Sequence, residues 1–180
     1  MPKFKRCDKS VPAMAAELLT CYENYKPILD AKVAIDYVFA YSTTDAPALK
    51  LHGERALAIA RVIKLKDRAM GRGDCEVCID GDWWRDPGIK DEERRAVLDH
   101  ELYHFVVILD DTGFKRDTFG RPCIGTRRHD RSFGWFDVIA QRHGEFSMER
   151  KQAHHILSGA GQMYWPELID PKTRVATEGL

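Results

Sequence analysis

The chain has 180 residues, of which 44% are hydrophobic and 31% are charged. This length and this composition suit one globular domain and exclude a disordered chain. The 28 Lys and Arg residues balance the 28 Asp and Glu residues, so the net charge gives no reason to expect nucleic acid or a membrane as a partner. A local basic patch remains compatible with a neutral total.

The sequence also bears on location and organisation. No apolar run approaches the roughly 20 residues of a membrane-spanning helix, and the charged N-terminus leads into no signal-peptide stretch. The five cysteines are scattered along the chain, which is typical of reduced thiols in a cytoplasm. We therefore expect a cytoplasmic protein with an N-terminal helical segment over 1–30, one domain over 31–165 and a tail over 166–180. The oligomeric state is left open.

The first half of the chain predicts one helix and three strands. Ser10 as a cap and Pro12 in the first turn favour a helix start. Apolar residues at helical spacing continue it over 13–25, and Pro27 interrupts it. Segments with alternating or β-branched residues predict strands over 31–41, 56–66 and 74–80.

The second half is predicted to be mainly helical. Three carboxylates at 91–93 favour a helix start through the helix dipole, and an apolar stripe continues this helix to Leu109. A polar loop over 112–126 follows. A further helix is predicted over 133–143 with Gly144 as its terminator, and Ser147 is predicted to cap a last helix. Together these elements indicate an α+β fold in which a small twisted sheet packs on the helix that begins at 91.

The motif His100-Glu101-Leu102-Tyr103-His104 lies within that helix. Histidines four residues apart share one face of a helix, so both imidazoles can bind one zinc ion. Glu101 lies beside the first ligand, where its carboxylate can take a proton from a zinc-bound water that attacks a peptide carbonyl. The motif therefore predicts a zinc-dependent metallopeptidase with a protein or peptide substrate.

A catalytic zinc site needs a third protein ligand. The compact pattern with a histidine six residues after His104 is excluded, because that position holds Asp110. The remaining candidates are His129, Asp130, His143, Glu145, Glu149, His154 and His155. His129 is favoured because it follows a glycine-containing loop, which gives the chain room to return to the motif. Glu145 and Glu149 remain alternatives.

Several neighbouring residues have two interpretations each. Asp130 can orient a ligand imidazole or cap a helix, and His143 can stabilise an oxyanion or simply interact with a helix C-terminus. Tyr103 is a weaker candidate for an oxyanion donor. Asp99 is expected on a solvated flank of the motif helix, and Arg127 in a solvated loop.

Short motifs over much of the chain resemble known families. Residues 129–133 resemble the third-ligand signature of SprT-like metallopeptidases, in which a turn-forming residue and then an aromatic residue follow a histidine. From about 32 to 149 the chain is similar to the Putative phage metallopeptidase family. The similarity is carried by the segments 74–80 and 93–104, by Trp84, and by the triplets at 120–122, 128–130, 134–136 and 142–144.

This resemblance implies a zincin-like fold in a protein encoded by a phage or prophage. It implies zinc at His100 and His104, Glu101 as the general base and His129 as the third ligand. It implies no particular substrate. Two other functions are compatible with the sequence: a non-catalytic zincin-fold protein that binds a host or virion partner, and a peptidase acting on DNA-bound proteins.

Overall fold

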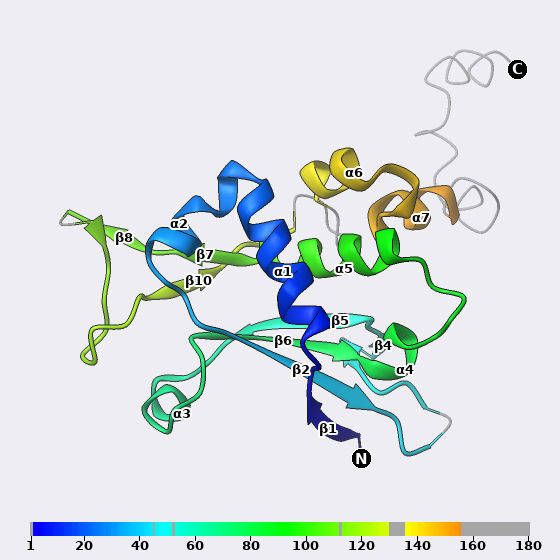
Figure 1. Ribbon diagram of the computed structural model, residues 1–180, viewed down its shortest axis with the longest axis horizontal. Coiled ribbons are helices and arrows are strands. Elements are labelled where there is room, and N and C mark those ends of the chain that lie inside the picture. The colour runs from blue at the N-terminus through cyan, green and yellow to red at the C-terminus, as the bar shows by residue number, and fades with distance from the viewer. Residues whose placement is uncertain (1, 45, 52, 112, 130–135, 156–180) are drawn as a thin grey trace, which may run out of the picture. The chain divides into compact units, whose positions relative to one another are not determined.

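The computed structural model describes residues 2–44, 46–51, 53–111, 113–129 and 136–155 (Figure 1). Its elements are a mixture of helices and strands, as predicted. The chain divides into two compact units, residues 1–129 and residues 130–180. Each unit is described by itself, and the domain bounds expected at 30/31 and 165/166 stay predictions.

The first unit contains a four-stranded sheet in the order β1-β2-β6-β5. The strands are β1 (Lys3–Arg6), β2 (Ile35–Tyr41), β5 (Ala58–Val62) and β6 (Cys75–Asp80). The central strands β2 and β6 are parallel, and each edge strand is antiparallel to its neighbour. All six residues of β6 are buried. Three of these strands confirm the predicted ones, whereas β1 was missed because three of its four residues are cationic.

One face of the sheet is covered by α1 (Ser10–Cys21) and α5 (Asp91–Tyr103), which lie side by side in Figure 1. Leu98 and Leu102 of α5 are fully buried, and each contributes about 1.5–3 kcal/mol through the apolar surface it removes from water. The prediction that Ser10 caps the first helix is wrong. Ser10 is the first residue of α1, and its backbone N–H donates to the carboxylate of Asp8 at 3.1 Å.

The chain between α1 and β2 continues through a short 3-10 helix (Glu23–Tyr25) and α2 (Lys26–Asp30). On the other face of the sheet, Ala40 and Cys78 form a small apolar cluster with Ala48 and Leu49. The short elements between the main strands are β3 (Lys50–Leu51), β4 (Glu54–Arg55), α3 (Leu65–Ala69) and α4 (Gly81–Trp84).

The helix predicted from residue 91 begins as expected but ends earlier. It stops at Tyr103, and Phe105–Val107 forms the strand β7 rather than the helix predicted to reach Leu109. β7 pairs antiparallel with β10 (Ile124–Thr126), which lies at the end of the predicted polar loop. Valines 106 and 107 are β-branched and favour a strand once a partner is present. The hairpin strands β8 (Leu109–Asp110) and β9 (Gly113–Phe114) follow β7.

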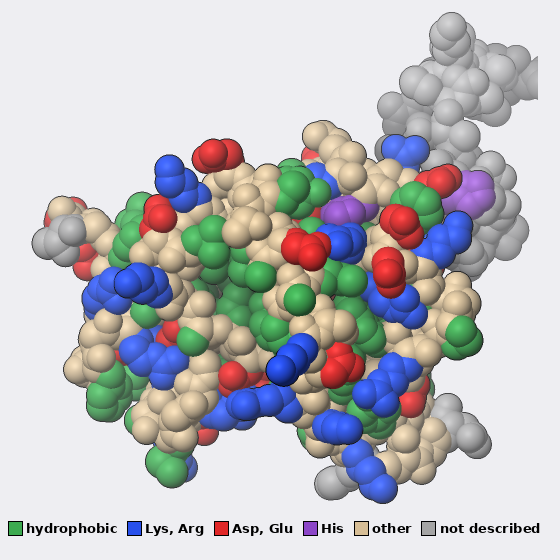
Figure 2. Space-filling view, viewed as in Figure 1, with side chains coloured by type: hydrophobic (Ala, Val, Ile, Leu, Met, Phe, Trp, Pro, Cys, Tyr) green, Lys and Arg blue, Asp and Glu red, His purple; other side chains and the backbone are tan. Residues whose placement is uncertain are grey.

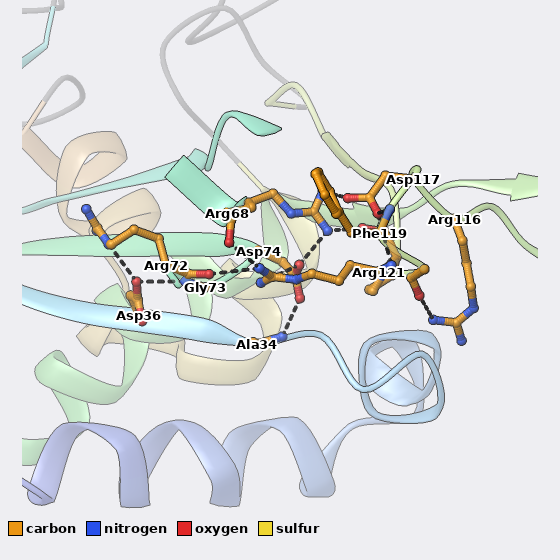
Figure 3. Close-up of polar contacts among 12 residues, drawn as sticks. Ala34, Asp36, Arg68, Arg72, Gly73, Asp74, Arg116, Asp117, Phe119 and Arg121 are labelled. Atoms are coloured by element: carbon orange, nitrogen blue, oxygen red, sulfur yellow. Dashed lines mark hydrogen bonds and ion pairs between the residues drawn. The ribbon is translucent and has the colours of Figure 1, made fainter. Parts of the chain in front are cut away.

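A buried network of charges joins the loop before β10 to the sheet (Figure 3). The Arg68 guanidinium contacts the carboxylates of Asp74 at 2.5 Å and Asp117 at 3.2 Å. Arg121 adds an ion pair to Asp74 at 2.8 Å, and the backbone N–H of Ala34 donates to the same carboxylate at 2.8 Å. The start of β2, the start of β6 and the loop before β10 are therefore held at one point.

The second unit contains α6 (Asp137–His143), a 3-10 helix (Gly144–Phe146) and α7 (Met148–His155). Gly144 follows α6 with φ of 52°, a left-handed value that favours glycine, so its predicted role as terminator is confirmed. The Ser147 hydroxyl accepts a hydrogen bond from the backbone N–H of Arg150 at 3.1 Å, which confirms the predicted cap. Residues 133–135 of the predicted helix lie outside the described residues.

A candidate metal centre

The two motif histidines occupy the C-terminal end of α5. His100 lies in its last turn, and His104 is the C-cap residue, with helical φ and ψ of −65° and −27°. The four-residue spacing therefore keeps its helical geometry, and the centroids of the two imidazole rings are 5.2 Å apart. Glu101, between them in sequence, is 7% exposed.

The pairing of β7 with β10 brings His129 to the same place. Phe105 lies opposite Thr126 in the ladder, and the next residue pair continues it, since the Arg127 N–H donates to the His104 carbonyl at 2.7 Å. His129 follows two residues later. Its ring centroid is 4.7 Å from that of His104 and 5.2 Å from that of His100. A segment 25 residues beyond the motif thus supplies a third imidazole.

The three histidines fit a zinc ion. One ligand atom from each lies within 4.8 Å of the others, and the Nε2 atoms of His100 and His129 are 3.2 Å apart. Two nitrogens bound to one tetrahedral zinc at about 2.0–2.1 Å would lie roughly 3.3 Å from each other. Three imidazoles are also a donor set that zinc accepts in catalytic sites, where the fourth position stays open.

His104 is held in a form suited to binding a metal. Its Nδ1 lies 2.9 Å from the Arg127 carbonyl oxygen, which can only accept, so Nδ1 carries the proton and Nε2 keeps its lone pair. Burial lowers the pKa of His104 to about 4, against the raising effect of this hydrogen bond, and the neighbouring charges of His100, His129 and Arg127 lower it further. His104 is therefore neutral at pH 7, as a metal ligand must be.

Two aromatic residues support Arg127 and the motif helix. The Arg127 guanidinium carbon lies 3.8 Å from the centroid of the Tyr103 ring, a cation–π contact. On α5, Tyr103 also contacts Tyr25, with ring centroids 6.4 Å apart. The Tyr25 hydroxyl donates to the carbonyl oxygen of Asp99 at 3.0 Å and to its carboxylate. The site is thus tied to the 3-10 helix that follows α1.

The structure corrects two expectations about these residues. Asp99 is fully buried rather than solvated, because Tyr25 supplies a hydrogen bond that offsets the cost of burial. Arg127 lies in a loop as expected, but it is half-buried, because its backbone is paired with His104 and its guanidinium lies on Tyr103. The β-branched residues Val106 and Val107 favour a strand, but nothing local in the sequence identifies the partner of that strand.

The remaining candidates lie outside the described residues or in the second unit. Asp130 lies outside the described residues. His143 is the last residue of α6 in the second unit, which also contains the alternative ligands Glu145, Glu149 and His154. The side chain of His155 is outside the described part. The roles considered for these residues stay predictions.

The chain was compared with protein families, curated proteins and solved structures. The family model described as Putative phage metallopeptidase matches residues 3–160. No curated protein and no solved structure matches the chain. In the described residues, no helix has the length and the apolar character needed to cross a bilayer.

Proposed function

Because the chain belongs to the Putative phage metallopeptidase family, we propose that it is a zinc-dependent endopeptidase with a zincin-like fold. The observation that carries this proposal is the convergence of His100, His104 and His129, whose ligand atoms lie within 4.8 Å of one another. The adjacent buried carboxylate of Glu101 supports catalysis rather than a purely structural metal site, because a structural site has no use for a carboxylate there.

In this proposal, the three imidazoles hold the metal and Glu101 moves protons. Zinc would supply Lewis acidity, which lowers the pKa of water and polarises a peptide carbonyl. The Glu101 carboxylate would accept the proton of the attacking water and pass it to the departing amine. Arg127 would keep the Nδ1 proton of His104 in place, so that Nε2 is always available as a ligand.

The substrate would be a protein or peptide bound in an extended conformation. β5 is one edge of the sheet and lies against α5. The Ile63 N–H donates to the Asp74 carbonyl at 2.9 Å across the β5–β6 ladder, so the alternation of the ladder turns the backbone groups of Ala58 and Ala60 away from β6. We place the substrate strand along these groups and expect the protein to act in the cytoplasm of an infected bacterium.

The first test is the zinc content of the purified protein. We expect about one zinc per chain in the wild type, since three histidines and one open position form one site. His100→Ala should lose the metal, His129→Ala should retain much less of it, and Glu101→Gln should retain it fully. A wild type that binds no zinc after incubation with the metal would overturn the proposal. Unchanged zinc in His129→Ala would instead exclude His129 as a ligand.

The second test separates catalysis from binding. The zinc-loaded wild type and Glu101→Gln would be incubated with a mixed peptide library, and new peptide termini would be identified by mass spectrometry. We expect cleavage by the wild type alone, because the variant lacks the proton acceptor. Zinc retention without cleavage by either protein would favour the non-catalytic binding function.

A further inference from the structure

The edge of the sheet opposite β5 has free backbone groups and a strong positive charge. Among the described strands, β1 pairs with β2 only. The Cys7 N–H donates to the Tyr37 carbonyl at 3.0 Å, and in an antiparallel ladder every second residue makes such bonds. Lys5 therefore bonds to β2 in the same way, while the N–H and C=O groups of Phe4 and Arg6 point outward.

The side chains of Phe4 and Arg6 line a hollow of about 380 Å³ on the sheet face away from α1 and α5. Arg61 and Arg72 also line it, which gives it three guanidinium groups, whereas the side chain of Lys5 points to the other face of the sheet because it alternates with Phe4 and Arg6. Asp36 and Glu76 supply two carboxylates to the hollow, so its charged side chains have an excess of one positive charge. In Figure 2, Lys and Arg side chains form a row across the lower part of the view, over β1 and β2.

The carboxylates of Asp36 and Glu76 hold Arg61 and Arg72 in position but leave their guanidinium groups accessible to solvent. Glu76 is almost completely buried and forms ion pairs with both Arg61 and Arg72. Asp36 accepts from Nε of Arg72 at 3.0 Å. Arg61 and Arg72 nevertheless remain 61% and 45% exposed. A guanidinium has five N–H donors, so each arginine keeps donors for an anion that enters the hollow from solvent.

We propose that β1 and this hollow bind an extended acidic segment of a partner polypeptide, which adds to the sheet as a fifth strand. Its backbone would pair with the outward N–H and C=O groups of Phe4 and Arg6. Its alternate side chains would point toward the sheet face that holds the hollow, where glutamate or aspartate carboxylates would meet Arg6 on the adjacent strand. A second copy of β1 does not fit this edge, because it would place lysine and arginine against lysine and arginine.

This proposal concerns a different edge of the sheet from the one assigned to the scissile segment. It does not depend on the zinc site, so each can fail without the other. If the peptidase function holds, β1 would select proteins that carry an acidic extended segment apart from the cleavage site. The binding test therefore uses the Glu101→Gln protein, in which cleavage cannot consume the probe.

The test is fluorescence anisotropy with a labelled peptide of about eight residues in which glutamate and threonine alternate, long enough for one strand. We expect saturable binding that weakens as salt is raised, because salt screens exposed charges. The same peptide with glutamine in place of glutamate should bind at least about tenfold more weakly. A third peptide, N-methylated at alternate residues, should also bind poorly, since strand addition needs its N–H groups.

Protein variants locate the binding. Arg6→Glu reverses an exposed charge on the edge strand and should weaken binding of the glutamate peptide by about tenfold or more. The matched control is Lys26→Glu, which makes the same kind of change at an exposed position in α2 and should leave binding unaltered. Circular dichroism would verify that both variants are folded.

Three outcomes would overturn the proposal. The first is no saturable binding of the glutamate peptide. The second is equal weakening by Arg6→Glu and Lys26→Glu, which would mean that only net charge matters. The third is binding of a labelled oligothymidylate that is tighter than that of the peptide and lost in Arg6→Glu, which would make the hollow a nucleic-acid site instead.

Discussion

Both backbone groups of Arg127, its N–H and its carbonyl, form hydrogen bonds with His104. Its N–H donates to the His104 carbonyl at 2.7 Å, and its carbonyl accepts from Nδ1 of the same residue at 2.9 Å. The first bond positions the end of α5 and the second sets the tautomer of the imidazole. Because the Arg127 guanidinium lies on the Tyr103 ring, the aromatic ring helps to hold both backbone bonds in place.

We therefore predict that Tyr103→Ala weakens zinc binding by about tenfold, the lower end of the effect of removing support from a metal ligand. Tyr103→Phe should bind zinc as the wild type does, since the ring that faces Arg127 is retained. The measurement is competition with a chromophoric zinc chelator. The melting temperatures of the zinc-free proteins serve as the control for general destabilisation. Equal zinc affinity in Tyr103→Ala and Tyr103→Phe would show that the ring does not support the site.

At the scale of elements, the pairing of β7 with β10 determines where the motif helix ends. The start of α5 was predictable because the carboxylates at 91–93 are a local signal. Its end was not, because residues 105–107 are apolar enough for either a helix or a strand. Only the partner strand, which begins at Ile124, decides between them. The convergence of His129 on the motif could be predicted as a return of the chain, but not its residue-by-residue register.

The buried charges around Asp74 fix the loop that leads into β10. Asp74 is 1% exposed and balances the positive charges of Arg68 and Arg121. We predict that Asp74→Asn lowers the free energy of unfolding by about 3 kcal/mol or more, since it leaves buried cations with less compensation. Urea unfolding monitored by circular dichroism would measure this change.

The matched control for Asp74→Asn is Asp91→Asn. Asp91 also pairs with an arginine, Arg94, at 2.7 Å, but its side chain is 73% exposed. An exposed pair of this kind contributes about 1 kcal/mol or less, so the control should change stability little. Similar losses in the two variants would contradict the buried role assigned to Asp74.

At the scale of the whole molecule, the pattern of apolar residues predicted most of the main helices and strands, whereas the charged residues did not indicate which of them are buried. The strands β2, β5 and β6 and the helix α5 were predicted from the spacing of apolar residues, which is visible in the sequence. By contrast, Asp74, Asp99 and Glu76 are charged residues that the fold buries with partners from distant segments. Charge on an isolated residue predicts exposure, and nothing local to these residues indicates the arginine or tyrosine that makes burial possible. The strand β1 was missed for the same reason: its residues are mostly cationic, and they form an edge strand only because β2 is present as a partner.

Acid should destabilise the whole metal-free protein through His104. In the unfolded chain this histidine takes up a proton near the ordinary histidine pKa of 6.5, whereas in the folded protein burial holds its pKa at about 4. Between these two values the unfolded state binds more protons, so stability falls as pH falls. The full shift corresponds to roughly 3 kcal/mol, lost between about pH 6.5 and about pH 4 and constant above that window.

Urea unfolding of the zinc-free protein at a series of pH values between about 7 and about 4.5 would test this dependence. His104→Gln is the informative comparison, because glutamine stays neutral throughout the window. Its free energy of unfolding should be lower than that of the wild type near neutral pH, but it should fall less steeply on acidification. Parallel curves for the two proteins would mean that His104 is not the group whose protonation opposes folding. The acid sensitivity would then have to arise from other buried groups, and the neutral state assigned to this ligand would lose its support.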